Sequence, residues 1–507
     1  MKPLLYLIAC VTLGGCTLDP NFTRPAPPVP AQWPVGGAYG ERAHALRSPE
    51  AARSASNTAA ESGDASSGQT PERESVTAAA TGNAMSPEIV AQPVAWQEFV
   101  QDARLKQVIE LALAHNRDIR RAIANIESAR AQYRIERSAL VPAVSAGGDY
   151  SRSRSNVALG AENTSVVSSA YSVSAGLSAY EVDFFGRVRS LSRAALQQYL
   201  ATEEAGRTTR ATVVAETSNA YIQLASDRAL LEVSLQTQAS AQKSIDLIRA
   251  RLSSGIASRT ELRQAETIFN QARADVANYR TLIEQDRNAL QLLVGERVSD
   301  DLMPEPLTPE SAFFHDVPAG MSSAILLERP DVAQAEHSLR AANANIGAAR
   351  AAFFPRISLT ASGGWSSNEL STLFSAGSRT WSFAPSISLP IFDGGYNRAN
   401  LAYSEAQRDA MLADYERAIQ TGFKEVADAL ARSGTIDEQI DAQRALYDAA
   451  LDTYGLTDAK YRRGIGAFLD ALDAQRTLYS ARQSYLSTLQ TAMENQVALY
   501  RALGGGV

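Results

Sequence analysis

Two long stretches of the chain carry small and apolar side chains at helical spacing, over residues 187–252 and 396–463. The first stretch contains no proline and one internal glycine, Gly206. A continuous helix of this size would be roughly 100 Å long, which exceeds the width of a globular domain. Its apolar and small positions include Val188, Leu191, Ala195, Tyr199, Val213, Ala220, Leu224, Leu231 and Leu235. The pattern therefore predicts two very long helices.

Each predicted long helix ends at a turn that contains glycine. The two turns lie at 253–258 and 462–467. In these turns Gly255 and Gly464 can adopt the left-handed conformation that closes a helix. Shorter helical patterns follow the two turns, at 259–294 and 468–503. Each half of the chain should therefore contain a helical hairpin with one long arm and one short arm.

A pattern of period two predicts four strands, arranged as β-hairpins at about 141–184 and 355–392. The apolar members of the second strand of each hairpin are Tyr171, Val173, Ala175, Leu177 and Ala179, and Trp381, Phe383, Pro385, Ile387 and Leu389. Segments 144–150 and 357–365 alternate likewise. Apolar residues on one face and small polar residues on the other are typical of transmembrane barrel strands. A soluble, half-buried sheet would show the same alternation. Pro385 suggests an edge or bulge position.

The two halves of the chain are copies of one another. Segments 118–142 and 331–355 have the same spacing, and a register shift of four residues later in the chain restores the match over more than 100 residues. The later matching positions are Arg189, Glu216, Ala220, Gly255, Ala265, Arg273, Leu290 and Gly295, which correspond to Arg398, Glu425, Ala429, Gly464, Ala474, Arg482, Leu499 and Gly504. The repeats should span 96–295 and 319–504, with a proline-rich equatorial linker at 296–318.

Four strands are too few for a membrane sheet, because lipid cannot satisfy an open sheet edge and closed barrels need about eight strands or more. Three copies would supply about twelve strands, enough for an aqueous lumen. The sequence therefore predicts an α+β membrane protein built from a duplicated helix–strand–strand–long helix–helix unit. Its trimer would form a 12-stranded β-barrel continuous with a periplasmic α-helical barrel.

The N-terminus has the features of an exported lipoprotein. Residues 1–15 form a signal peptide, with Lys2 before an apolar core at 4–11, and Leu13-Gly14-Gly15-Cys16 is similar to a lipoprotein box. We therefore expect a covalent lipid on Cys16; a plain signal peptide with an incidental cysteine is the alternative. Residues 16–35 should form an extended, acylated strap. Residues 36–95, poor in large apolar side chains, are predicted to be a disordered, low-complexity linker.

Charge and composition exclude several other functions. The net charge of −7 argues against a nucleic-acid partner, since such proteins are normally basic. Both cysteines lie within the first 16 residues, and the four histidines are scattered. The sequence contains no nucleophile motif, phosphate loop or metal-ligand cluster. We therefore expect neither an enzyme nor a bound metal or cofactor apart from the lipid.

The chain resembles the outer-membrane efflux proteins of the TolC class, and most closely the lipoprotein branch typified by OprM and NodT. The resemblance covers nearly the whole chain except about 36–93, and it lies in the order and spacing of individually weak motifs. The matching motifs are Leu13 to Cys16, Asp19 to Pro30, Leu111 to Ile119, Ala129 to Ala131, Pro142, Phe185 to Arg187, Tyr461 to Gly464, Leu472 to Gln475 and Leu499 to Gly504.

This resemblance implies a homotrimeric channel in the cell outer membrane that extends into the periplasm. It would give passive exit to substrates that an inner-membrane RND pump delivers through a periplasmic adaptor. A duct for type I protein secretion is an alternative within this class. A periplasmic coiled-coil scaffold is the alternative outside it, but a scaffold would not explain the strands or the duplication. The sequence does not name the cargo, because in such systems the pump selects it.

The resemblance also assigns roles to the helix tips. The family's gate tyrosine and its two aspartates match Tyr461, Asp470 and Asp473, whereas a basic gate residue of some relatives falls on Gly466. In a trimer the two aspartates, which share a helical face, would place six carboxylates around the axis and attract cations. A solvated helix face is the alternative. The adaptor would dock on tip residues Gly255, Ser258, Gly464 and Ile465, unless these residues only cap the helices.

Overall fold

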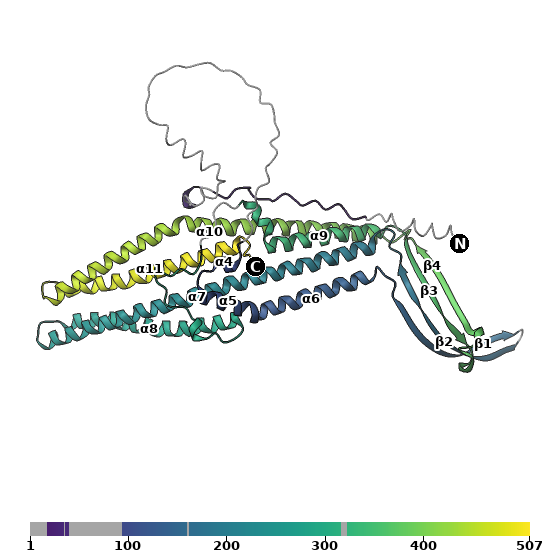
Figure 1. Cartoon of the computed structure of the whole chain (residues 1–507), viewed down its shortest axis with the longest axis horizontal. Coiled ribbons are helices and arrows are strands. Elements are labelled where there is room, and N and C mark those ends of the chain that lie inside the picture. The colour runs from purple at the N-terminus through teal and green to yellow at the C-terminus, as the bar shows by residue number, and fades with distance from the viewer. Residues whose placement is uncertain (1–17, 35, 40–93, 160–161, 316–321, 507) are drawn as a thin grey trace, which may run out of the picture. The chain divides into compact units, whose positions relative to one another are not determined.

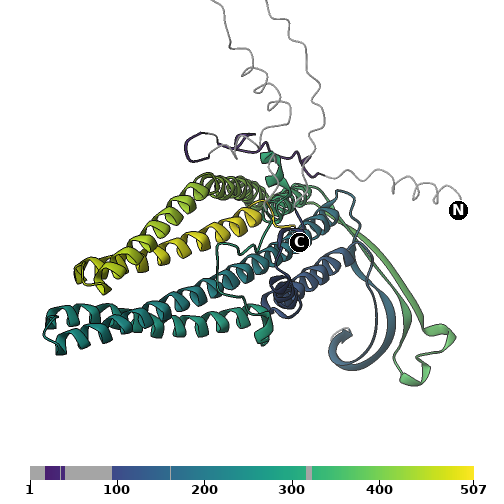
Figure 2. The ribbon, with the colours of Figure 1, turned by 60° about the vertical axis from the view of Figure 1, so that its left-hand side comes forward.

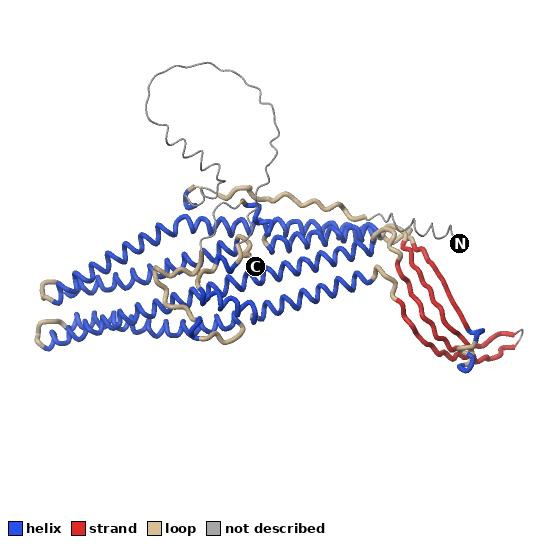
Figure 3. The backbone as a smooth tube through the Cα atoms, viewed as in Figure 1, coloured by secondary structure: helices blue, strands red, loops and turns tan. Residues whose placement is uncertain are grey.

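The computed structural model describes residues 18–34, 36–39, 94–159, 162–315 and 322–506. They form two compact units. Of the described residues, one unit combines 18–26 with those in segments 123–204 and 333–416, and the other combines those in segments 27–122, 205–332 and 417–506. Each long helix contributes to both units. Figure 1 labels the helices and strands, and Figure 3 colours them by type.

The helical periodicity of the sequence corresponds to two helices of 67 residues each, α7 (Arg187–Ser253) and α10 (Tyr396–Arg462). The shorter arms are α8 (Arg259–Val294) and α11 (Phe468–Ala502). The remaining α-helices of the described chain are α4 (Trp96–Phe99), α5 (Ala103–His115), α6 (Arg117–Ser138) and α9 (Pro330–Ala351). Within the described residues, none of the helices is both long enough and apolar enough to cross a bilayer.

Four antiparallel strands form one sheet in the order β1-β2-β3-β4. They are β1 (Val144–Leu159), β2 (Glu162–Glu181), β3 (Arg356–Ser367) and β4 (Arg379–Ser388) (Figure 1). Figure 2 shows that the β1–β2 pair and the β3–β4 pair diverge away from the helices. Pro385 lies on β4, an outer strand of this sheet in the described chain, and pairs with Leu359 of β3. Of the two positions predicted for this proline, edge or bulge, the edge position is confirmed.

The faces of the sheet follow the alternation seen in the sequence. On one face serine hydroxyls meet across strands, as between Ser362 and Ser382 at 2.8 Å. On the other face large apolar side chains are exposed in the single chain, among them Trp381, Phe383 and Ile387. The regular alternation predicted up to Ala179 is interrupted, because the β2–β3 register shifts between Leu177 and Tyr180 and Ala179 has a positive φ of 51°.

The core of the second unit is built from α5, α7, α8 and α11. Its fully buried side chains include Leu105, Ile109, Tyr221, Leu224 and Leu290. The predicted linker, described as far as residue 315, contributes Met303, Leu307 and Phe313 to the same core. The linker is held against α7 by a hydrogen bond from the Leu307 N–H to the Ala225 carbonyl at 2.9 Å.

The strap is well anchored within the first unit. Asp19 accepts a hydrogen bond from the Ser190 hydroxyl and pairs with Arg193, both on α7. Gly347 on α9 permits this approach, because a Cβ there would collide with the Asp19 carboxylate. Arg24 reaches Glu336 at 2.7 Å. An extended segment with few internal contacts therefore gains its order from the helices beneath it.

The predicted disorder over 36–95 is wrong at its first residues. Gly37–Tyr39 forms a short 3₁₀-helix in the second unit. Gly434 on α10 makes room for it, since a Cβ there would meet the Ala38 carbonyl oxygen at 2.2 Å. Composition alone misses this contact because Gly434 is far away in the chain. Residues 40–93 of the predicted linker lie outside the described residues, as do residues 1–17 with Cys16.

Candidate functional site

The turn between α7 and α8 is closed by backbone bonds and a side-chain cap. Gly255 has φ +75°, and its N–H donates to the Leu252 carbonyl at 3.0 Å while the Ile256 N–H donates to Arg251 at 2.9 Å. This is the Schellman pattern of a left-handed C-cap, which confirms the conformation predicted for Gly255. Ser258 then begins α8 by accepting the Glu261 N–H at 3.1 Å.

The turn between α10 and α11 repeats the first half of this geometry. Gly464 has φ +76°, and the N–H groups of Gly464 and Ile465 donate to carbonyls at 3.0 and 3.1 Å. The second half differs, because the residue before α11 is Ala467, whose side chain cannot cap. Both turns are exposed, with Ile256 72% and Ile465 75% accessible. The structure therefore places all four predicted docking residues on exposed turns.

The Tyr461 side chain is buried within the single chain. The residue is 6% exposed, and its ring is 5.4 Å from that of Phe468. The guanidinium of Arg251, at the end of α7, lies 4.7 Å from the ring centroid. The Tyr461 hydroxyl is buried and has no hydrogen-bond partner among the described residues. In the single chain the structure thus brings this predicted gate residue together with Arg251 and not with the two predicted aspartates.

Asp470 and Asp473 share one exposed face of α11, as their spacing predicts. Both line a groove of about 670 Å³, whose α10 side includes Thr453 and Thr457. Asp470 also lies in the first turn of α11, where a negative charge interacts favourably with the helix dipole. The arrangement can hold hydrated cations, and it can equally act as a solvated helix start.

Sequence reasoning missed two residues beside these turns. Nothing in the sequence indicated a role for Arg251, because its partner, Tyr461, is 210 residues away in the chain. Gln475 on α11 is 7% exposed, and its Nε2 has no hydrogen-bond partner among the described residues. Gln475 lines a second groove, of about 330 Å³, together with Tyr461. Pairwise contacts of this kind leave no signal in a single sequence.

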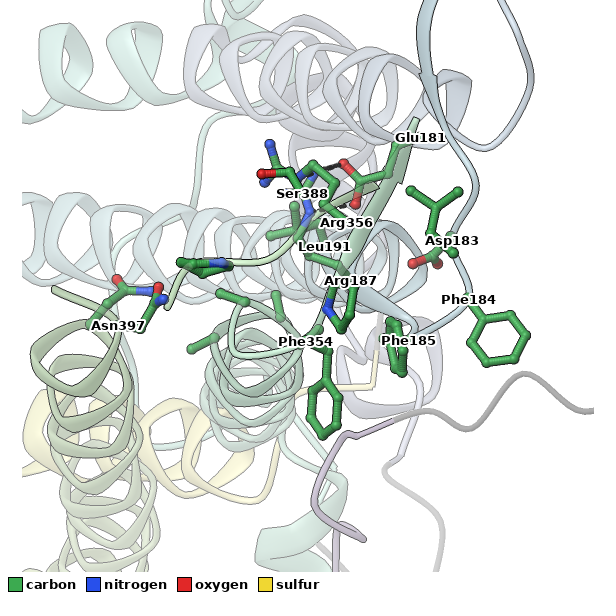
Figure 4. A pocket seen from close by; sticks show the side chains of 18 of the residues that line it. Glu181, Asp183, Phe184, Phe185, Arg187, Leu191, Phe354, Arg356, Ser388 and Asn397 are labelled. Carbon is green, nitrogen blue, oxygen red and sulfur yellow. Dashed lines mark hydrogen bonds and ion pairs between the residues drawn. The ribbon is translucent and has the colours of Figure 1, made fainter. Parts of the chain in front are cut away.

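A separate cavity of about 630 Å³ lies in the first unit, where the strands give way to helices (Figure 4). Arg187 binds Glu181 through two hydrogen bonds of 2.7 Å, and Arg356 approaches the same carboxylate at 3.4 Å. Phe185 stacks on Phe354 with ring centroids 4.8 Å apart. These contacts join the end of β2, the start of β3 and the start of α7. Within the described ranges, no group of three or more possible metal ligands is found.

Comparison with known proteins agrees with the duplicated architecture. The family model described as "Outer membrane efflux protein" matches residues 108–296 and again 321–505. The chain belongs to the outer membrane efflux protein family. It is therefore an outer-membrane efflux channel protein that extends into the periplasm, and its family is one of transport proteins and not of enzymes.

Individual relatives match over most of their length. The probable efflux pump outer membrane protein TtgC of Pseudomonas putida is 43% identical over 506 residues, 100% of this chain and 96% of TtgC. Outer membrane protein OprJ of Pseudomonas aeruginosa is 41% identical, covering 86% of this chain and 82% of OprJ. The open state of the MtrE outer membrane channel of Neisseria gonorrhoeae superimposes with a TM-score of 0.76 at 37% identity, covering 87% of this chain and 98% of MtrE.

Proposed function

We propose that three copies of this chain close a common duct through which substrates leave the periplasm. The observation that carries the proposal is the sheet itself, in which β1 and β4 each have one neighbouring strand within the described chain. A membrane sheet cannot leave such edges open, because lipid offers no hydrogen bonds to backbone groups. Pairing β4 of one copy with β1 of the next would join three sheets into a twelve-stranded barrel. The exposed apolar face, with Trp381 and Ile387, would then contact lipid.

The helices suit the periplasmic part of this duct. At the usual rise of 1.5 Å per residue, α7 and α10 would each be about 100 Å long, enough to cross much of a periplasm. The exposed turns at Gly255 and Gly464 would dock a periplasmic adaptor, and the adaptor would connect them to an inner-membrane RND pump. The names of the relatives, which include an efflux pump outer membrane protein, support such partners. The duct itself would select cargo only weakly.

The N-terminus would add a second attachment to the membrane. Cys16 would carry a covalent lipid, and the strap that follows is held on α7 and α9 through Asp19 and Arg24. One lipid chain alone binds a membrane only moderately, whereas a lipid combined with barrel strands gives stable anchoring.

The mouth of the duct would be narrowed by Asp470 and Asp473 on α11, with Tyr461 fixing the adjacent turn. Three-fold symmetry would bring six exposed carboxylates near one axis, so that multivalent cations bind and block the pore. Removal of two carboxylates per copy should weaken block by about tenfold, which corresponds to about 1.4 kcal/mol.

Planar-bilayer recording of the purified full-length protein tests both parts of the proposal. We expect wild-type trimers to form discrete pores that a trivalent cation added on the periplasmic side blocks. The double variant Asp470→Asn, Asp473→Asn should conduct more and resist block. Asp452→Asn is a matched control, because Asp452 is exposed on α10 but does not line the groove. A monomer without pores would refute the duct. Pores whose block is unchanged in the double variant would refute only the role of the aspartates.

A further inference from the structure

The apolar face of the sheet carries a belt of aromatic side chains. Directly opposed residues of antiparallel strands lie on the same face of a sheet, so the strand register shows which side chains share the face of Trp381. They include one large aromatic residue on each strand, namely Tyr150, Tyr171, Trp365 and Trp381 on β1 to β4 in turn. The rings of Tyr150 and Tyr171 are stacked with their centroids 4.7 Å apart. In transmembrane barrels such belts mark the level of the membrane interface.

This belt belongs to the interface remote from the helices. All four strands meet the helices at one end of the sheet (Figure 1). Apolar residues of the same face, such as Val144 and Ile387, lie between that end and the belt. The belt moves towards the helices by two residues from Tyr171 to Trp365 and by two more to Trp381. A belt that is level with the membrane requires such steps, because the strands of a barrel are tilted.

Arginines follow the belt on the side away from the helices. On β1, Arg152 and Arg154 are the next two residues of this face beyond Tyr150. On β4, Arg379 is the next residue of the face beyond Trp381. All three arginines are exposed in the single chain. Because they lie just beyond the aromatic belt, their guanidinium groups would reach the level of the outer lipid headgroups.

These arginines have no acidic partner among the side chains that the structure describes. Arg154 donates to the Ser165 hydroxyl at 2.9 Å and makes no ion pair there. Asp149 belongs to the opposite face, because successive residues of a strand alternate between faces. Glu369, in the connection between β3 and β4, accepts from the Ser371 hydroxyl at 3.4 Å. Three positive charges beside an apolar surface are therefore left for an external anion.

The arginines occur only on the two outer strands of the sheet. The corresponding positions of the inner strands are Ser169 on β2 and Ser367 on β3. The inner strands separate β1 from β4 within one chain. In the proposed three-copy barrel, however, β4 of one copy lies beside β1 of the next, at the usual strand spacing of about 4.8 Å. Each seam between two copies would thus gather the arginines of both.

We propose that Arg152 and Arg154 of one copy and Arg379 of the next bind the phosphate groups of an outer-leaflet lipid at each seam. The inference rests on the proposed three-copy barrel. A guanidinium stays charged at every physiological pH and binds phosphate through two parallel hydrogen bonds. The occupant is a lipid and not a soluble anion, because its acyl chains would cover the aromatic belt that adjoins the arginines. The lipid would join neighbouring copies as well as the protein to the membrane.

Binding of diphosphoryl lipid A to the purified full-length protein in detergent tests the site. The triple variant Arg152→Gln, Arg154→Gln, Arg379→Gln should bind at least about tenfold more weakly, because losing one charged hydrogen bond can have this effect. Added salt should weaken binding to wild type much more than to the variant. Lipid A from which both phosphates have been removed should bind wild type and variant equally.

The matched control removes three exposed arginines of α6, which lies outside the sheet, in the variant Arg117→Gln, Arg120→Gln, Arg134→Gln. This variant has the same change in net charge and should bind diphosphoryl lipid A like wild type. Equal losses in the two triple variants would show a general charge effect and overturn the site. Unchanged affinity in the sheet variant would overturn it as well.

Cross-linking separates a failure of the site from a failure of the barrel. In the double variant Arg152→Cys, Arg379→Cys, a short bis-maleimide reagent should join neighbouring copies into covalent trimers. Either cysteine variant alone should stay unlinked. If the copies are linked but the triple glutamine variant binds lipid A normally, the barrel stands and the lipid site is wrong. Copies that cannot be linked would overturn the seam, on which both the site and the proposed barrel depend.

Discussion

The two turns at the ends of the helical hairpins share a backbone path but are held by different forces. Both close with a glycine at φ near +75° and the same pair of backbone hydrogen bonds. The first turn then relies on a local side-chain cap, Ser258 on Glu261 N–H. The second has no such cap at Ala467 and relies on Tyr461, packed between Arg251 and Phe468.

This difference shows where a moving part can be built. A cap joins atoms three residues apart, so it persists however the hairpins move relative to each other. The contact of Arg251 with Tyr461 joins α7 to α10, so it must change when the hairpins separate. Under the proposed function we therefore expect the contacts of the second turn to change when the mouth opens, whereas those that close the first turn should persist. Three sets of variants test this contrast.

The largest effect is expected for Tyr461→Ala. Truncating a buried aromatic side chain removes packing and leaves a cavity, which costs about 3–5 kcal/mol. The equivalent position in the first turn is Leu252, which is only partly buried, so Leu252→Ala should cost less than half as much. Denaturant unfolding in detergent measures both, and conductance of the closed pore should rise only for Tyr461→Ala. Equal losses at the two positions would remove the contrast between the turns.

A smaller effect is expected from Gly466→Ala. A Cβ at this position would lie 2.9 Å from the Lys460 Cβ and 3.2 Å from the Tyr461 nitrogen, so the turn must shift at a cost of about 1–3 kcal/mol. The first turn already has alanine, Ala257, at the equivalent position. Gly455→Ala is the control, because Gly455 lies within α10 with open space around it, and that change should stabilise the helix slightly. Unchanged melting of Gly466→Ala would show that the second turn is loosely packed.

The smallest effect concerns the caps themselves. Ser258→Ala should destabilise α8 by about 1 kcal/mol, and Ala467→Ser should stabilise α11 by a similar amount or less. Hydrogen exchange of the first turns of α8 and α11 reports these local changes. If Ser258→Ala leaves exchange at Glu261 unaltered, the first turn is not held by its cap.

The sequence predicts features that depend on neighbouring residues, such as helices, but not contacts between residues that are far apart in the chain. The spacing of apolar residues places a helix over 187–252, and α7 spans Arg187–Ser253, because periodicity is a local property of the chain. The ordered residues 36–39 and the partner of Tyr461 escaped prediction because they depend on Gly434 and Arg251, which lie hundreds of residues away.

The sequence by itself determined the duplication, the hairpin order and the membership of the outer membrane efflux family, since repeated spacing and alternation are written in consecutive residues. Only the tertiary structure decided which side chains meet, as Tyr461 meets Arg251 and Asp19 meets Ser190. The physical reason is that local backbone preferences fix helices and strands, whereas burial and hydrogen bonding depend on how distant segments pack.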